Sequence, residues 1–417
     1  MGRGENDVKM LSRFATLTLS AAIFVFLVPA DAVAGGPKAK IRVMSQNQYL
    51  GANLTPIVAA ETPGEFNDAV ITALYDVDAN NYPERVQSLA ATIANRGPQL
   101  VGLQEMFAFG CTPVSFTIPD PCSTFGLAFN DHLTATLGAL DDLGVNYYEA
   151  ATVQNLSLDF IFPGPTSGFG IPGIPVFLDL DFLPDIFVTV IDQDVILARS
   201  DVSTTPVPFV CAKPSLQGCN YFNVAETEVA GIPINIERGF VAVDATFKGD
   251  EFRFVNTHLE VRFPDPEDPL SMALQALQAS ELLFTMTTQP EPAGSRVIVV
   301  GDFNSDPGDL PPVPFFTPYQ QFVTGRAIDG TPISSPFADT WLLRPQDEPG
   351  LTCCEDGDLL NTTTVHERRV DIIFSKTMPD KVIASKVLNT TASDKTPSGL
   401  WPSDHATVDA MLKYDNR

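Results

Sequence analysis

The stretch VIVVGDFNSDP, residues 297–307, limits most strongly what this chain can fold into. Its first four residues are apolar and β-branched, which predicts a buried strand. Asp302 and Asn304 follow two positions apart, a spacing that puts both side chains on one face of an extended chain. A core strand thus delivers a carboxylate and a carboxamide to one point. Alone, such a strand end is more often structural than catalytic, so its meaning depends on partners elsewhere in the chain.

Other predicted strands end in polar residues in the same way. Alternating or continuous apolar patterns predict strands at 41–48, 100–105, 146–153, 194–200, 239–247, 252–258, 369–375, 382–388 and after residue 405. The polar residues at the ends of these strands are Asn47, Glu105, His258, Asp371, Asp404 and His405. Each has a structural explanation on its own, as a turn former or a salt-bridged strand end. Their repeated placement favours convergence at one edge of a sandwich.

Helical periodicity predicts the elements that cover these strands. Helices are expected at 83–96, 128–143, 268–287 and about 316–324, where apolar residues recur on one face. The segment from the first strand to about residue 82 is expected to be a polar connection containing proline. His132 and His366 are expected at the surface.

Residues 156–187 have an unusual pattern for a soluble protein. Apolar residues alternate at 156–162 and again at 176–182, on either side of a tip rich in proline and glycine. This pattern predicts a β-hairpin with an apolar tip at 163–175. Two interpretations stay open: an insertion packed on its own domain, or a finger that makes peripheral contact with a lipid surface or an apolar substrate.

The N-terminus and the cysteines predict export. Residues 1–34 have a basic start, an apolar run and the small-residue site Ala32-Val33-Ala34, as in a signal peptide; an uncleaved anchor is the alternative. The six cysteines suit an oxidising compartment. Two pairs, Cys111 with Cys122 and Cys211 with Cys219, are spaced to close local loops. The adjacent Cys353 and Cys354 either bond to each other or pair elsewhere.

The charge of the chain constrains its partners. The 417 residues carry a net charge of −26. Tight, non-specific binding to duplex DNA depends on Lys and Arg neutralising phosphates, so this surface argues against it. A nuclease that works with divalent cations is still compatible, and the acidic excess suits cation binding.

Six pieces of the sequence, in order, resemble one enzyme superfamily. VMSQN, LVGLQE, NTHLE, VVGDFNSDP, RVDIIF and SDH run from residue 41 to the C-terminus. As a set they resemble the endonuclease/exonuclease/phosphatase superfamily, which includes DNase I, apurinic endonucleases, neutral sphingomyelinases and inositol-phosphate phosphatases. The resemblance implies an α/β protein, a four-layer α/β/β/α sandwich of two similar halves, with one catalytic domain over residues 35–417 and long loop insertions.

The resemblance also implies a metal site. Glu105 matches the family's main Mg²⁺ ligand, with Asn47 beside it and Asp404 at the metal or just behind its ligands. Carboxylate and amide oxygens are what a hard cation prefers, and Ca²⁺ or Mn²⁺ are alternatives to Mg²⁺. The sequence does not decide whether the site holds one metal ion or two.

Five further residues match the family's catalytic positions. His405 resembles the catalytic histidine, with Asp371 orienting it and stabilising its charged form. Asp302 would orient or deprotonate the attacking water, Asn304 would hold the phosphate, and His258 would contact the phosphate or the leaving group. The sequence does not locate a carboxylate partner for His258 or decide which acid is the base.

These observations predict a secreted, metal-dependent phosphoesterase, expected to be monomeric. The acidic charge and the apolar 163–175 tip favour a lipid phosphodiesterase of the sphingomyelinase or phospholipase C kind, acting on phospholipid head groups. A DNase I-like nuclease acting on nucleic acid is the first alternative, and a phosphomonoesterase the next. A nuclease would need a basic groove, for which the candidates are Arg238, Arg262, Arg368 and Arg369. A non-catalytic binding module should have lost motif residues, and none is lost.

Overall fold

Two β–α–β units form the centre of the fold. In the computed structural model, β1 (Ala39–Asn47) and β2 (Leu100–Gln104) are parallel and are connected through α3 (Tyr82–Arg96). Likewise β12 (Asp250–His258) and β13 (Arg296–Asp302) are parallel and are connected through α6 (Pro269–Thr288). Such a crossover is what parallel strands require, and it brings the carboxyl ends of each pair to one sheet edge. The structure describes residues 39–113, 121–162, 186–229, 232–262, 268–310, 315–346 and 348–415.

Each parallel pair lies inside a larger sheet, and the two sheets repeat one pattern. In the first sheet the order is β16-β17-β1-β2-β5-β3, with β4 paired to β5. In the second it is β14-β15-β13-β12-β11-β8-β7, with β6 paired to β11. Antiparallel neighbours flank the parallel pair in both, β17 and β5 in one and β15 and β11 in the other. The prediction of two similar halves is therefore confirmed.

The remaining elements have the following bounds. The first sheet also contains β3 (Ala108–Pro113), β4 (Tyr147–Phe162), β5 (Ile186–Arg199), β16 (Lys381–Leu388) and β17 (Thr407–Tyr414). The second contains β6 (Ser203–Pro206), β7 (Lys213–Ser215), β8 (Gly218–Asn220), β11 (Gly239–Phe247), β14 (Ala338–Asp339) and β15 (Asp371–Ser375). A separate hairpin pairs β9 (Ala225–Val229) with β10 (Ile232–Ile236). The other helices are α1 (Thr55–Val58), α2 (Pro63–Ala79), α4 (Pro121–Thr124), α5 (His132–Asp142) and α7 (Pro318–Thr324), with short 3₁₀ turns at Thr340–Leu343 and Ala392–Asp394.

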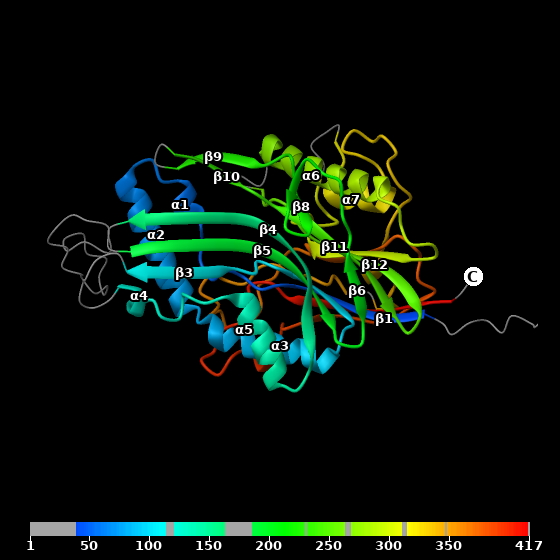
Figure 1. Cartoon of the computed structure of the whole chain (residues 1–417), viewed down its shortest axis with the longest axis horizontal. Helices are drawn as coiled ribbons and strands as arrows, with labels where there is room; N and C mark the ends of the chain where they lie inside the picture. The colour runs from blue at the N-terminus through cyan, green and yellow to red at the C-terminus, as the bar shows by residue number, and fades with distance from the viewer. Residues whose placement is uncertain are drawn as a thin grey trace, which may run out of the picture. The chain divides into compact units, whose positions relative to one another are not determined.

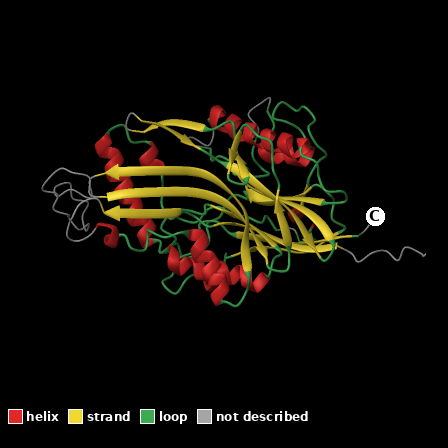
Figure 2. Cartoon of the chain, viewed as in Figure 1, coloured by secondary structure: helices red, strands yellow, loops and turns green. Residues whose placement is uncertain are grey.

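Three apolar cores define four layers (Figures 1 and 2). The first core lies between the sheets and includes Val43 of β1 and Val300 of β13. The second packs α3 and α5 on the outer face of the first sheet, and the third packs α6 and α7 on the outer face of the second. Residues 297–300 are buried on both faces of β13 because alternate side chains enter the inter-sheet core and the outer core. The α/β/β/α sandwich is confirmed.

The predicted hairpin is longer than expected, and its second arm differs. Strand β4 pairs with β5 from Tyr147 opposite Arg199 to Phe162 opposite Ile186, with register shifts on the way. The predicted second arm, 176–182, and the tip, 163–175, lie outside the described residues, as do residues 1–34. The two predicted strands at 146–153 and 156–162 are one continuous strand.

The predicted polar connection before residue 82 is wrong, because α2 fills most of it. Thr62 accepts a hydrogen bond from the Glu65 amide, and Glu65 bonds back to the Thr62 amide. This capping box starts the helix directly before its apolar residues. Its buried face includes Ile71 and Leu74, which join an apolar cluster with Phe107. The sequence Thr62-Pro63-Gly64-Glu65 is itself a capping-box signal for this helix.

The two histidines expected at the surface are removed from solvent. The His132 ring is fully buried and stacked on Tyr82, with ring centroids 3.4 Å apart. Burial holds the pKa of His132 well below its usual value, so the ring is neutral. The side chain of His366 is only 4 % exposed and its Nε2 lies 3.1 Å from Glu355 Oε1. The local sequence around each histidine does not report the long-range packing that buries it.

The described cysteines are all in disulfides. Cys111 bonds to Cys122 and Cys211 to Cys219, as predicted, and the adjacent Cys353 and Cys354 bond to each other. Among the described helices, none combines the length and the apolar character that crossing a membrane requires.

Candidate active site

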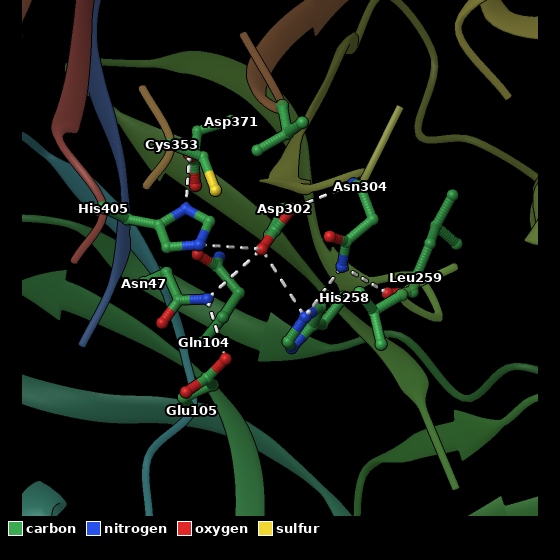
Figure 3. A network of polar contacts seen from close by, with 12 residues as sticks. Asn47, Gln104, Glu105, His258, Leu259, Asp302, Asn304, Cys353, Asp371 and His405 are labelled. Carbon is green, nitrogen blue, oxygen red and sulfur yellow. Dashed lines mark hydrogen bonds and ion pairs between the residues drawn. The ribbon is translucent and has the colours of Figure 1, made fainter. Parts of the chain in front are cut away.

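The residues at the strand ends converge where the two sheets meet (Figure 3). Asn47 ends β1, and Glu105 follows β2 directly. In the other sheet, His258 ends β12 and is in register with Asp302 at the end of β13. The parallel pairing therefore brings four predicted site residues to one region from segments up to 255 residues apart.

Asp302 lies at the centre of this group. One carboxylate oxygen, Oδ2, accepts a hydrogen bond from Asn47 Nδ2 at 3.2 Å. The same oxygen lies 3.5 Å from His258 Nε2 and 3.6 Å from His405 Nε2. The other oxygen accepts from the Asn304 amide at 2.9 Å, which closes the turn after β13. One buried carboxylate thus faces two imidazoles and a carboxamide.

Asp371 and His405 form a dyad next to Asp302. Asp371 starts β15 and is directly opposite Asp302 in the antiparallel register. Its Oδ2 is 2.8 Å from His405 Nδ1, so His405 Nε2 points toward Asp302. The loop of His405 is fixed by Ser403, whose hydroxyl donates to the Asn47 carbonyl and accepts from the His405 amide. The predicted pairing of Asp371 with His405 is observed.

Glu105 and Asn47 form the neighbouring part of the site. Asn47 Nδ2 bridges Glu105 Oε1 (3.1 Å) and Asp302, while Asn47 Oδ1 accepts from the Tyr49 amide. The second Glu105 oxygen accepts from the Leu50 amide at 3.0 Å. Glu105 and Tyr49 have positive φ, 55° and 57°, a strained conformation for such residues. Asn47 therefore presents its amide nitrogen to both acids, and its role as a metal ligand stays a prediction.

Asn304 and His258 contact each other on the far side of Asp302. Asn304 Nδ2 donates to the Leu259 carbonyl at 2.9 Å and lies 3.3 Å from His258 Nε2. The other imidazole nitrogen of His258 is 3.3 Å from an Arg238 guanidinium nitrogen. Because a guanidinium only donates, His258 Nδ1 is the acceptor and Nε2 carries the hydrogen. The neighbour of Nδ1 is thus a cation, which local sequence did not indicate.

Asp404 is beside the dyad but makes few contacts. Its Oδ1 lies 3.4 Å from the Ser403 hydroxyl oxygen, whose hydrogen goes to the closer Asn47 carbonyl. Burial, Glu105 and Asp302 raise the pKa of Asp404 to about 7, although His405 opposes them. The negative charges of Glu105 and Asp302 both raise the pKa of Asp404, so the three acids are near one another. This is compatible with the predicted position of Asp404 near a metal ion.

The electrostatics separate the two histidines. Burial, Arg238 and His405 hold the pKa of His258 well below its usual value, so His258 is neutral. Burial by itself would lower the pKa of His405, but Asp371 and the two neighbouring aspartates raise it well above its usual value. The site therefore combines a neutral imidazole with a charged one, an arrangement suited to holding and protonating an oxyanion.

The acidic residues fit a hard divalent cation. Burial, with Asp371 nearby, raises the pKa of Asp302 even though His405 acts against the shift. The raised carboxyl pKa values at Asp302 and Asp404 mean that burial disfavours their charged forms more than His405 favours them. Asp302, Asp371 and His405 also bring ligand atoms within 4.8 Å of one another. Oxygen donors of this type suit Mg²⁺, Ca²⁺ or Mn²⁺.

Sequence reasoning missed two residues that hold the site together. Arg85 is fully buried on α3 and donates to the carbonyls of Gln48 and Pro402, which joins the end of β1 to the loop of His405. Thr352 accepts from the Asp371 amide, and its carbonyl accepts from the Ala406 amide. Neither residue is in a motif, and both act through backbone groups of distant segments.

The fold was compared with known proteins. No protein-family model and no curated protein matches the sequence. One similar solved structure is an endonuclease/exonuclease/phosphatase from Beutenbergia cavernae, with 19% identity, a TM-score of 0.45, and coverage of 90% of this chain and 72% of that one. A protein of the same family from Bacteroides thetaiotaomicron has 15% identity, a TM-score of 0.45, and coverage of 91% and 99%. Humanized D. rerio TDP2 has 15% identity, a TM-score of 0.45, and coverage of 89% and 98%.

Identities at this level concern the fold alone. The sheets and cores described above establish that fold without reference to these structures. They form the four-layer α/β/β/α sandwich that the sequence motifs predict.

Proposed function

We propose that this protein is a metal-dependent phosphoric ester hydrolase that cleaves phosphodiesters by in-line attack of water. One observation carries the proposal: Asp302 lies within 3.6 Å of two imidazoles in different charge states, beside the Asp371–His405 dyad and the Glu105 carboxylate. Structural ion pairs do not need a neutral and a charged histidine around one acid. Acid–base catalysis at a phosphoryl group can use both, with the neutral histidine holding a phosphate oxygen and the charged one donating a proton.

Each residue then has a defined task. Asp302 orients the attacking water and accepts its proton. The charged His405, held by Asp371, donates from Nε2 to a phosphoryl oxygen or to the leaving group. His258 donates from its Nε2–H, and Asn304 adds a carboxamide donor to the same phosphate. A divalent cation held by Glu105, with Asn47 and Asp404 nearby, would polarise the phosphoryl oxygen and offset its developing charge.

For the substrate, we favour the head group of a phospholipid over nucleic acid. Duplex binding needs Arg or Lys side chains that are free to contact phosphates, but every arginine considered for a basic groove is paired with an acid. The pairs are Arg238 with Asp192 and Glu260, Arg262 and Arg368 with Asp309, and Arg369 with Asp339. Paired charges attract phosphates weakly. The net charge of −26 supports the same preference. A nuclease and a phosphomonoesterase stay the alternatives, and we propose that the protein is exported.

A substrate panel tests the proposal. The purified protein is incubated with sphingomyelin, phosphatidylcholine, plasmid DNA, RNA and a small phosphate ester, each with Mg²⁺, Ca²⁺ or a chelator. We expect release of phosphorylated head group from a lipid, supported by the cation and abolished by the chelator. Cleavage of DNA or RNA alone would replace the lipid assignment with the nuclease alternative. Hydrolysis that persists in chelator would contradict metal dependence, and no hydrolysis of any substrate would contradict the proposal.

A further inference from the structure

Three buried side chains on the β4–β5 hairpin each leave one oxygen without a partner. They are Asn155, Asp192 and Asp194, which are at most 3 % exposed. Asp194 Oδ2 accepts from Asn155 Nδ2 at 2.9 Å, and Asp192 Oδ2 faces Arg238 at 3.4 Å. The remaining oxygens, Asn155 Oδ1, Asp192 Oδ1 and Asp194 Oδ1, have no hydrogen-bond partner among the described residues. Buried oxygens in this state cost free energy unless a ligand satisfies them.

The strand geometry brings these three side chains to one place. Asp192 and Asp194 are two positions apart on β5, so they point to the same face. On β4, Val153 is opposite Asp194 and Leu156 is opposite Asp192, with a register shift between Gln154 and Leu156. The shift inserts Asn155 as an extra residue beside the two acids. β-Bulges of this kind re-aim a side chain and are frequent next to active sites.

The charge around the hairpin acids is not balanced. Three acids, Asp192, Asp194 and Glu260, are buried here. Among the described residues, Arg238 is the cation that pairs with Asp192 and Glu260. Burial, together with Glu105, raises the pKa of Asp192 to about 7, although Arg238 and Asn155 oppose the shift. Burial and the nearby charge of Asp192 raise the pKa of Asp194 well above its usual value, and Asn155 again opposes the shift. Asn155 thus acts on both acids, and this group lacks positive charge.

We propose that Asn155, Asp192 and Asp194 form a binding site for a second hard divalent cation, separate from the cation at Glu105. The three unpartnered oxygens, two from carboxylates and one from a carboxamide, are the ligand type that Mg²⁺, Ca²⁺ and Mn²⁺ take in proteins, with water completing the coordination. A bound cation would satisfy all three oxygens and supply the missing charge. This site does not depend on the proposed reaction, because its ligands are outside the dyad and the motifs.

The site is connected to the catalytic group through Arg238. The guanidinium nitrogen that faces Asp192 is also 3.3 Å from His258 Nδ1. A cation on Asp192 would compete with Arg238 for that carboxylate and leave the guanidinium closer to His258 and Glu260. The second cation is therefore expected to tune the orientation of His258, not to contact the substrate.

Counting bound Mn²⁺ tests the second site without any assay of activity. The purified full-length protein is dialysed free of metal and titrated with Mn²⁺, and free Mn²⁺ is followed by electron paramagnetic resonance. We expect two Mn²⁺ per wild-type chain, one for Asp194→Asn, one for Glu105→Gln, and none for the double variant. Asp159→Asn is the matched control, since it removes an exposed acid from β4, the other strand of the same hairpin, and should leave two.

Two outcomes would overturn the proposal. One is a wild-type count of one that Glu105→Gln reduces to none. The other is an unchanged count of two in Asp194→Asn. The first result would mean that Asp192 and Asp194 share a proton instead of a cation, and the second that another site holds the second Mn²⁺. Circular dichroism of Asp194→Asn checks the fold. Asp192→Asn serves as the second variant, because the site should need both carboxylates for full occupancy.

Discussion

Replacing Asp302 with Asn is expected to lower kcat for a phosphodiester by about 10²- to 10⁴-fold, with a smaller effect on KM. The carboxamide has the same shape and can still accept the hydrogen bond from the Asn304 amide, but it cannot take a proton from water. Because Asp302 is one of the acids that raise the pKa of His405, the change also removes part of the charge that keeps His405 protonated. Steady-state kinetics with bis(p-nitrophenyl) phosphate measures the loss.

Asp306→Asn is the matched control for this variant. Asp306 lies on the same loop, but its carboxylate accepts from the backbone amides of Gly308 and Arg369 and not from a site residue. Its kcat should stay near that of the wild type. If Asp302→Asn and Asp306→Asn had the same kcat, Asp302 would not be the residue that handles the water.

The second large effect concerns Arg85, which holds distant backbone segments together. Its guanidinium donates to four carbonyls, those of Asn80 (2.8 Å), Gln48 (2.9 Å), Pro402 (2.8 Å) and Tyr49 (3.0 Å). The side chain is fully buried. These carbonyls come from the segment that follows β1, from the end of α2 and from the loop before His405, so one side chain fixes the relative positions of all three.

Arg85→Leu is expected to lower the free energy of unfolding by about 3–5 kcal/mol, because each buried carbonyl that loses its donor costs about 1–3 kcal/mol and some will find water. Urea denaturation followed by fluorescence measures the change. Arg326→Leu is the control: Arg326 is exposed and its side chain donates to the nearby Gly330 carbonyl, so the expected effect is about 0.5 kcal/mol or less. Equal stability of the two variants would refute the structural role of Arg85.

The sequence was sufficient for the fold and for most of the candidate site. The apolar strands of both halves could be placed because their residues are buried on both faces, as at 297–300, and continuous β-branched runs report that burial directly. The strand-end residues converge because parallel pairing brings their ends together. For this reason the sequence alone assigns four residues to one candidate site: Asn47, Glu105, His258 and Asp302.

The residues that were missed depend on contacts between distant segments. Arg238 is next to His258 only after β11 and β12 pair, and His132 is buried only because it stacks on Tyr82 of another helix. Arg85 has no motif around it, since backbone carbonyls can be supplied by any residue type. Local sequence reports periodicity and capping, but not the partner that a side chain reaches across 20 or more positions.

The most direct test of the account is hydrolysis by His405→Ala. Its central claim is that the Asp371–His405 dyad and Asp302 cleave a phosphodiester together. The wild type, His405→Ala and the isosteric His405→Asn are assayed with Mg²⁺ on the substrate that the panel identifies, after circular dichroism has confirmed that all three are folded. We predict that hydrolysis falls to background in both variants. Folded variants that retain wild-type hydrolysis would contradict the claim.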